Sequence, residues 1–249
     1  MDINNKYYII KHMIDEYEKT SKNTTKNKYL VILYGPPSSG KTNARNHSCK
    51  LIQTYFEEKN NINETFVNTG IDDLLNLYKI NNILINNYKL NKTISELEKS
   101  SKLIYYYYRN KMDHLSELTI WWAIHCNSNI YFEIASGDIN YIKDLIKRCN
   151  YYNYIPIICY PYTNDSELLY KRNIIRSREI GRIISHEDIK NKMNKCIESF
   201  EYIKNKLFQK YNNIIVASYS TNNNNNNNDD NYINLLVKIN NKIIINKRS

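Results

Sequence analysis

A glycine-rich loop directly follows a short apolar segment near the N-terminus. Residues 35–42 read Gly-Pro-Pro-Ser-Ser-Gly-Lys-Thr, and residues 29–34 read Tyr-Leu-Val-Ile-Leu-Tyr. A continuous apolar run of this kind is typical of a strand buried on both faces of a parallel sheet. The residues from 42 to 57 can continue as a helix. A strand, a glycine loop and a helix in this order predict a phosphate-binding unit.

The loop predicts nucleotide binding because its small residues let backbone N–H groups turn inward around a phosphate. The N-terminus of the following helix adds partial positive charge. Lys41 is expected to reach the β- and γ-phosphates, and the Thr42 hydroxyl is expected to hold magnesium. The predicted cofactors are therefore ATP or GTP with Mg²⁺. The predicted nucleotide contacts are Gly35, Pro36, Pro37, Ser38, Ser39, Gly40, Lys41 and Thr42.

Short apolar strands alternate with helical patterns along the rest of the chain. This alternation predicts an α/β fold of the P-loop NTPase or kinase type, with a mostly parallel central sheet and helices on both faces. The expected strands are 29–34, 65–68, 129–134, 154–160 and 214–218, and the expected helices are 42–57, much of 73–126, 138–149, 168–184 and 185–211.

The length of 249 residues fits one sizeable domain with flanking segments. Residues 1–28 are expected to hold an N-terminal amphipathic helix, and residues 29–219 the nucleotide-binding domain. Residues 220–249 contain seven consecutive asparagines at 222–228, which are expected to form a loop. The end of the chain, which alternates around Asn240 and Asn241, is expected to form a hairpin or an edge strand.

Composition excludes few functions. The net charge of +10 fits an anionic partner, but the lysines are scattered among asparagines, so nucleic acid is an open partner and not the favoured one. The five cysteines show no zinc-ligand spacing. The sequence shows neither a signal peptide nor a long apolar span. We therefore expect a soluble cytoplasmic protein that does not use a membrane, located in the host cytoplasm if its source is a virus.

Acidic residues follow two of the expected strands. P-loop folds bind substrates at the carboxyl ends of their strands, so Asp72, Asp73 and Glu133 are candidates for chemistry. Asp72 and Asp73 fit a helix N-cap pair equally well. Glu133 is the more informative acid, because a carboxylate in an apolar strand costs desolvation unless it is paired.

Four arginines lie between residues 172 and 182, namely Arg172, Arg176, Arg178 and Arg182. Guanidinium groups stabilise the charge of a transferring phosphoryl group, so one or two of these arginines are candidates to close over the phosphates. An ordinary basic helix face explains the cluster equally well.

The order of these parts resembles the zeta toxin family of P-loop kinases. The parts are Gly35–Thr42, then Gly-Ile-Asp-Asp-Leu at 70–74, Ile-Tyr-Phe-Glu at 130–133, Arg172, and Gly-Arg-Ile-Ile at 181–184. The resemblance runs from about residue 29 to 219, with a helical insertion at 75–110. It implies an enzyme that phosphorylates a hydroxyl of a small molecule, characteristically the amino sugar of UDP-N-acetylglucosamine in bacterial toxins.

The resemblance also implies roles for individual residues. Asp72 matches the general base of the family, with Asp73 as its replacement if the strand is shifted by one residue. Glu133 matches the acid that contacts the acceptor. Arg172 and Arg182 match the two arginines that embrace the transferred phosphate. Residues 134–137 depart from the family pattern, which leaves the acceptor contacts open.

Two other functions fit the same sequence. One is a kinase that acts on nucleosides or polynucleotide ends, and the other is a nucleotide-binding regulatory module without transfer activity. No antitoxin-like partner can be inferred from a single chain.

Overall fold

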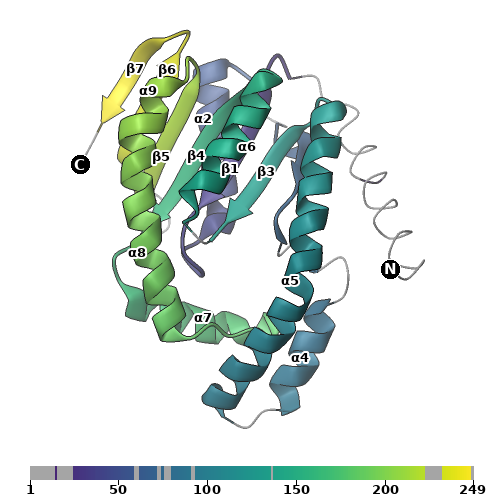
Figure 1. Ribbon diagram of the computed structural model, residues 1–249. Coiled ribbons are helices and arrows are strands. Elements are labelled where there is room, and N and C mark those ends of the chain that lie inside the picture. Colours follow the sequence, from purple (N-terminus) through teal and green to yellow (C-terminus); the bar gives the residue numbers. More distant parts are fainter. Residues whose placement is uncertain are drawn as a thin grey trace.

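The computed structural model describes residues 15, 25–58, 62–71, 74–75, 80–90, 93–135, 137–221 and 232–247, without the side chains at 63, 64 and 81. Its centre is a seven-stranded sheet in the order β2-β3-β1-β4-β5-β6-β7 (Figure 1). The strands are β1 (Lys28–Tyr34), β2 (Phe66–Asn68), β3 (Asn129–Ile134), β4 (Tyr154–Tyr162), β5 (Ile214–Ser220), β6 (Tyr232–Ile239) and β7 (Lys242–Lys247). Strands β1 to β5 run parallel, and β6 and β7 pair antiparallel at one edge.

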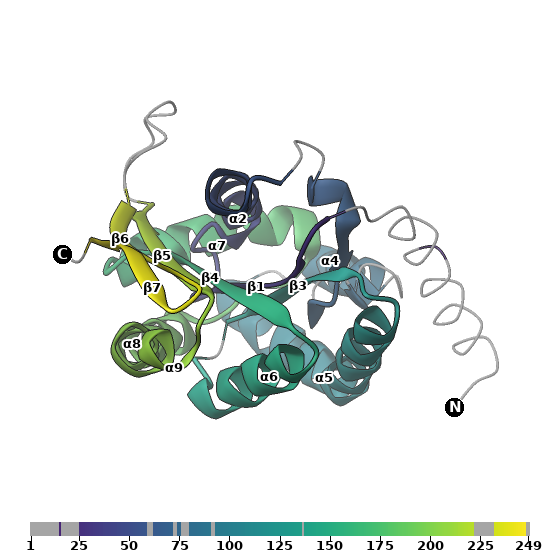
Figure 2. The ribbon, with the colours of Figure 1, turned by 90° about the horizontal axis from the view of Figure 1, so that it is seen from above.

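Helices cover both faces of the sheet, as the alternating pattern predicts. They are α2 (Lys41–Phe56), α4 (Ile80–Leu90), α5 (Ile94–His125), α6 (Ile139–Tyr151), α7 (Ser166–Ile180), α8 (His186–Tyr202) and α9 (Phe208–Lys210), with a 3₁₀ turn η1 (Ile62–Thr65) and a π-helical turn η2 (Ile203–Leu207). Figure 2 shows α2 on one face and α5, α6 and α8 on the other. The predicted fold class is confirmed.

Strand β1 shows why the apolar run is continuous. Tyr29, Val31 and Leu33 pack in the core cluster that contains α2 residues. The alternate residues, Leu30 among them, pack in the cluster beneath α5, α6 and α8. Every residue from 29 to 34 has 0% of its surface exposed. A strand buried on both faces has no position for a polar side chain.

The C-terminal segment forms the hairpin that the sequence predicts, and it also continues the sheet. Asn240 and Asn241 have φ values of 48° and 66°. Asparagine accepts this left-handed conformation, which suits a two-residue hairpin turn. The N-terminal helix predicted over 1–28 falls outside the described residues, apart from Asp15 and 25–28, and the asparagine run at 222–228 falls outside them entirely.

A second layer lies beyond the carboxyl ends of the strands, built from α4, the first half of α5, and α7 (Figure 1). Gly181 ends α7 with φ 69°, and a Cβ there would lie 2.2 Å from the Leu84 carbonyl carbon and the Ile85 nitrogen of α4. Only glycine permits this approach. The helical insertion predicted at 75–110 overlaps α4 and the start of α5, and its boundaries stay a prediction.

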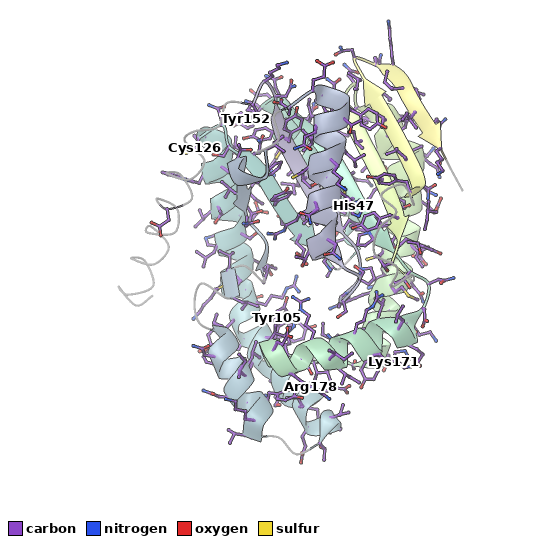
Figure 3. All side chains as sticks on the ribbon, turned by 180° about the vertical axis from the view of Figure 1, so that it is seen from behind. His47, Tyr105, Cys126, Tyr152, Lys171 and Arg178 are labelled. Carbon is purple, nitrogen blue, oxygen red and sulfur yellow. The ribbon has the colours of Figure 1, made fainter. Side chains whose placement is uncertain are left out.

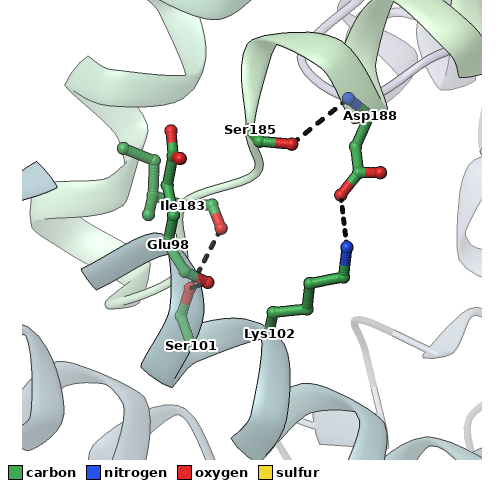
Figure 4. Close-up of polar contacts among 6 residues, drawn as sticks. All are labelled: Glu98, Ser101, Lys102, Ile183, Ser185 and Asp188. Carbon is green, nitrogen blue, oxygen red and sulfur yellow. Dashed lines mark hydrogen bonds and ion pairs between the residues drawn. The ribbon is translucent and has the colours of Figure 1, made fainter. Parts of the chain in front are cut away.

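Polar contacts tie α5 to the loop between α7 and α8 (Figure 4). The Ser101 hydroxyl donates to the Ile183 carbonyl at 3.0 Å, and both residues are buried. Lys102 pairs with Asp188, in the first turn of α8, at 3.1 Å. Ser185 caps α8 by accepting a hydrogen bond from the Asp188 backbone N–H. These contacts hold α5 over the carboxyl ends of the strands. In the described ranges, no helix is both long enough and apolar enough to cross a membrane.

Candidate active site

Backbone carbonyls of the glycine loop bind the side chain of Lys41. The Gly35 N–H donates to the Ile134 carbonyl at 3.1 Å, which fixes the start of the loop to β3. Lys41 Nζ donates to the Gly35 and Pro36 carbonyls at 3.1 and 2.9 Å. The Lys41 side chain therefore lies along the inner side of the loop, where the sequence predicts a phosphate.

The N-terminus of α2 differs from those of four other helices. Thr93, Asp138, Asp165 and Ser185 cap α5, α6, α7 and α8 with side-chain oxygens. Helix α2 begins after Gly40, at φ 92°, with no side-chain cap and no acidic residue in its first turn. Its first backbone N–H groups and the positive end of its dipole therefore face the loop, as a phosphate site requires.

Two serine hydroxyls in the loop support this assignment. Ser38 Oγ and Ser39 Oγ are enclosed, and neither forms a hydrogen bond with the part of the chain that the structure describes. Buried hydroxyls are usually hydrogen-bonded, so these two fit a site that is completed by phosphate oxygens. A cavity of about 190 Å³ lies over the loop, and its lining residues are Ser38, Gly40, Lys41, Thr42, Glu133, Arg172 and Arg176. We refer to it as the phosphate cavity.

The Thr42 side chain is exposed and lines the phosphate cavity. A magnesium ion carried on nucleotide phosphates would find a hydroxyl ligand there, which is the role that the sequence predicts. Within the described ranges, no group of three or more His, Cys, Asp or Glu side chains is arranged to hold a metal ion. The position of Thr42 in the wall of the phosphate cavity fits the magnesium role that the sequence predicts for it.

Glu133 lies near the end of β3, level with Leu33 of β1. Its carboxylate is 3.6 Å from Lys41 Nζ, and the two side chains are 21% and 6% exposed. The charged residue in the apolar strand is therefore paired, which offsets its desolvation. The pair places a carboxylate at the mouth of the phosphate cavity.

Asp72 and Asp73, the candidates for the general base, lie outside the described residues. The chain just before them is firmly held. Thr69 donates from its backbone nitrogen and its hydroxyl to the Tyr131 carbonyl at 2.9 and 2.8 Å. The Ser116 hydroxyl donates to the Thr69 carbonyl at 2.5 Å. Ile71 lines a second, larger cavity.

The larger cavity has a volume of about 580 Å³ and lies between α5, α7, α8 and the end of β3. We refer to it as the acceptor cavity. Its lining includes Phe132 and Tyr141 near β3 and Tyr105 and Tyr106 on α5. This is the size and mixed lining of a site for a small organic ligand.

Cations gather around Tyr105 in the acceptor cavity. The Arg182 guanidinium lies 4.2 Å from the centre of the Tyr105 ring, and Arg109 donates to the Tyr105 hydroxyl at 3.3 Å. Lys192 of α8 lines the same cavity. Burial lowers the pKa of Lys192, and the positive charges of Arg182, Arg109 and Lys41 lower it further, against the opposing effect of Asp188. This part of the cavity favours an anionic ligand.

Glu117, an acidic residue in the lining of the acceptor cavity, accepts hydrogen bonds from two neighbouring side chains. Arg148 donates to Glu117 at 2.6 Å, and the Tyr141 hydroxyl also donates to Glu117. Burial alone would raise the pKa of Glu117, but these two hydrogen bonds hold it below its usual value. Burial and the neighbouring Glu117 raise the pKa of Tyr141, so its hydroxyl stays protonated. This cluster thus keeps Glu117 ionised and Tyr141 neutral.

The four clustered arginines take four different positions relative to the two cavities. Arg172 lines the phosphate cavity and donates to the Thr221 carbonyl at 2.6 Å. Arg182 lines only the acceptor cavity, and Arg176 lines both. Arg178 lines neither. In Figure 3, Tyr105 lies on the side of α7 that faces the sheet, whereas Arg178 and Lys171 lie along the outer side of this helix.

Arg176 belongs to the arginine cluster, but the family resemblance assigns individual roles only to Arg172 and Arg182. It follows Arg172 by four positions, so the two side chains share one face of α7. This helical spacing is the signal that could have identified it. The phosphate role predicted for Arg182 stays a prediction, and its position places it on the acceptor side.

A comparison with known proteins finds a relative of this chain. The chain is 34% identical over 235 residues to L872 of Acanthamoeba polyphaga mimivirus, a protein described as uncharacterized, and the match covers 85% of this chain and 68% of L872. This chain belongs to the L872 family. No protein-family model matches the sequence.

The fold of this L872 family member is also found in a bacterial protein. A solved structure of the PezAT chromosomal toxin-antitoxin system of Streptococcus pneumoniae matches with a TM-score of 0.62 and 14% identity, over 89% of this chain and 79% of that chain. The likeness confirms the predicted α/β fold with its mostly parallel central sheet. The Pnkp1/Rnl/Hen1 RNA repair complex matches with a TM-score of only 0.45, over 72% of this chain and 48% of that chain.

Proposed function

We propose that the protein is a Mg²⁺-dependent phosphotransferase that moves the γ-phosphoryl group of ATP or GTP to a hydroxyl of a small molecule. One observation carries this proposal. The phosphate cavity and the acceptor cavity meet, and both are lined by Ser38, Lys41, Glu133 and Arg176. A nucleotide-binding module needs only the first cavity, whereas group transfer needs two cavities that share a wall of charged residues.

The acceptor oxygen forms a bond to the γ-phosphorus of the bound nucleotide. The bond between the γ-phosphorus and the bridging oxygen of the β-phosphate breaks, and ADP or GDP leaves with that electron pair. Lys41 stabilises negative charge on the phosphate oxygens, and Arg172 approaches them from α7. Glu133 holds Lys41 in place and contacts the acceptor. Asp72 takes the proton of the acceptor hydroxyl and passes it to solvent.

The cations around Tyr105 support an acceptor that itself carries phosphate. Arg109, Arg182 and Lys192 approach the acceptor cavity from α5, the α7–α8 loop and α8. Their charges favour a nucleotide sugar, such as UDP-N-acetylglucosamine, over an uncharged nucleoside. The volume of about 580 Å³ is sufficient for a ligand of that size.

The test is incubation of the purified protein with Mg·ATP or Mg·GTP and a panel of nucleotide sugars, nucleosides and oligonucleotides, followed by mass spectrometry. We expect a phosphorylated nucleotide sugar that is absent with the Lys41→Met variant. A Lys41-dependent product on an oligonucleotide would instead identify a polynucleotide kinase. Nucleotide binding without any product would indicate a regulatory module.

The assignment of the base is tested separately, with Asp72→Asn and Asp73→Asn. We expect Asp72→Asn to retain nucleotide affinity and to lose transfer by about 100-fold or more, the range for a removed general base. Asp73→Asn should retain both. Unchanged turnover in Asp72→Asn, with loss in Asp73→Asn, would move the role to Asp73.

A further inference from the structure

Arg176 occupies a position that no other arginine of the described residues shares. It is the one arginine that lines both the phosphate cavity and the acceptor cavity. The transferring phosphoryl group must pass between these two cavities. A guanidinium on their shared boundary can therefore hold that group in both locations.

The two neighbouring arginines are already held by the protein. Arg172 donates through both terminal nitrogens to Thr221, at 2.6 Å to the carbonyl and 3.5 Å to the hydroxyl. Arg182 is stacked over Tyr105 at 4.2 Å and lies beyond the end of α7. Arg176 forms no hydrogen bond, ion pair or ring contact within the ranges that the structure describes, and its side chain is exposed. It is therefore available to a ligand.

Contacts at both ends of α7 fix the helix that carries Arg172 and Arg176. Asp165 caps its start by accepting from the Leu168 N–H at 2.9 Å, and Gly181 ends it against α4. The buried Asn173 accepts from the Ile184 N–H at 2.8 Å. Two arginines one turn apart on a helix repel each other, so the pair on this fixed helix carries a small cost that a bound anion removes.

We propose that Arg176 contacts the γ-phosphoryl group of the bound nucleotide and that Arg182 serves the acceptor side. This inference rests on the proposed function. Arg172, which Thr221 holds in place, and Arg176 share one face of α7, and both line the phosphate cavity together with Lys41. Arg176 then distinguishes a nucleoside triphosphate from a diphosphate, because only the triphosphate extends to the boundary between the cavities.

The test is the affinity of the full chain for Mg·AMP-PNP and Mg·ADP, measured by isothermal titration calorimetry. Arg176→Ala should bind AMP-PNP about tenfold or more weakly, the range for a lost charged hydrogen bond, and ADP within about twofold of the wild type. Arg178→Ala is the matched control on the outer side of α7 and should change neither affinity. Unfolding temperatures of all variants report whether the fold is retained.

Three results would overturn the proposal. If Arg182→Ala loses AMP-PNP affinity and Arg176→Ala does not, the γ-phosphate contact belongs to Arg182. If Arg176→Ala weakens AMP-PNP and ADP equally, the residue acts on the nucleotide as a whole. If the wild type binds neither nucleotide, the proposed function itself fails, and the role of Arg176 fails with it.

Discussion

The phosphate cavity and the acceptor cavity are built in different ways. The phosphate cavity takes most of its contacts from the short segment between Gly35 and Thr42, where one strand passes into one helix. The acceptor cavity is assembled from α5, α7 and α8, through contacts such as that between Ser101 and Ile183, which are 82 residues apart. Phosphate binding is therefore a local property of this chain, whereas the choice of acceptor depends on tertiary packing.

The largest effect should come from Lys41, where the two cavities meet. We expect Lys41→Met to lower the rate of phosphate transfer by about 1,000-fold, the upper range for removal of one stabilising charge. The substitution also leaves Glu133 without its partner, so the unfolding temperature should fall. Initial rates of transfer and thermal unfolding measure the two effects.

The double variant Lys41→Met/Glu133→Gln separates these effects. It removes the unpaired carboxylate and should recover stability without recovering transfer. Recovery of transfer in the double variant would show that Lys41 acts only by pairing with Glu133.

The next effect concerns the packing of α7, which lies outside the glycine loop. Gly181→Ala places a Cβ against the backbone of α4 and requires a left-handed φ of an L-residue. We expect a loss of about 3 kcal/mol in the free energy of unfolding, from overpacking and backbone strain together. Affinity for Mg·ADP, which the glycine loop binds, should fall less than affinity for Mg·AMP-PNP, because Arg172 and Arg176 lie on α7. Denaturant unfolding and calorimetry provide the two measurements.

A smaller effect is expected from the contact between α5 and the α7–α8 loop. Ser101→Ala removes one buried hydrogen bond and leaves the Ile183 carbonyl without that donor. The free energy of unfolding should fall by about 1–2 kcal/mol. The Michaelis constant for the acceptor should rise, while that for the nucleotide stays constant. A change confined to the nucleotide constant would contradict the separation of the two cavities.

The smallest effect concerns Lys192 and pH. Burial and the charges of Arg182, Arg109 and Lys41 lower its pKa from the ordinary 10.5, although Asp188 opposes this. Between the lowered and the ordinary value, the unfolded chain binds more protons than the folded chain, so stability should rise as pH rises through this window. Lys192→Met should be more stable than the wild type at neutral pH, and the difference should shrink towards pH 10.5.

Unfolding temperatures across this pH range test the prediction. Lys190→Met removes the same charge from an exposed position of α8 that lines neither cavity. It separates the local effect from the loss of one positive charge. An equal response of both variants would place Lys192 in ordinary solvent contact.

The parts of the protein that the sequence could predict are those built from neighbouring residues. The strand, loop and helix around Gly35–Thr42 are formed by adjacent residues. The continuous apolar run of β1 is typical of a strand buried on both faces. The five parallel strands and the hairpin at Asn240 and Asn241 follow from periodicity and turn chemistry. Glu133 could be predicted because an unpaired acid in an apolar strand is costly.

The acceptor cavity could not be predicted in the same way. Nothing near Tyr105 in the sequence indicates that Arg182 stacks on its ring, and nothing near Lys192 indicates which cations lower its pKa. These relations depend on Gly181, which lets α7 approach α4, and on the packing of α5 over the strand ends. For the same reason, the sequence does not predict that Arg176 lines both cavities.

In the proposed reaction, a phosphoryl group crosses from the phosphate cavity to the acceptor cavity. The test is incubation of the protein with γ-³²P-labelled ATP and GTP and a small-molecule cell extract, with the Lys41→Met variant in parallel. The account predicts a labelled small molecule that forms only with the wild type, and its formation should slow strongly in Glu133→Gln. Tight nucleotide binding with label released only as inorganic phosphate, at any extract concentration, would contradict the account.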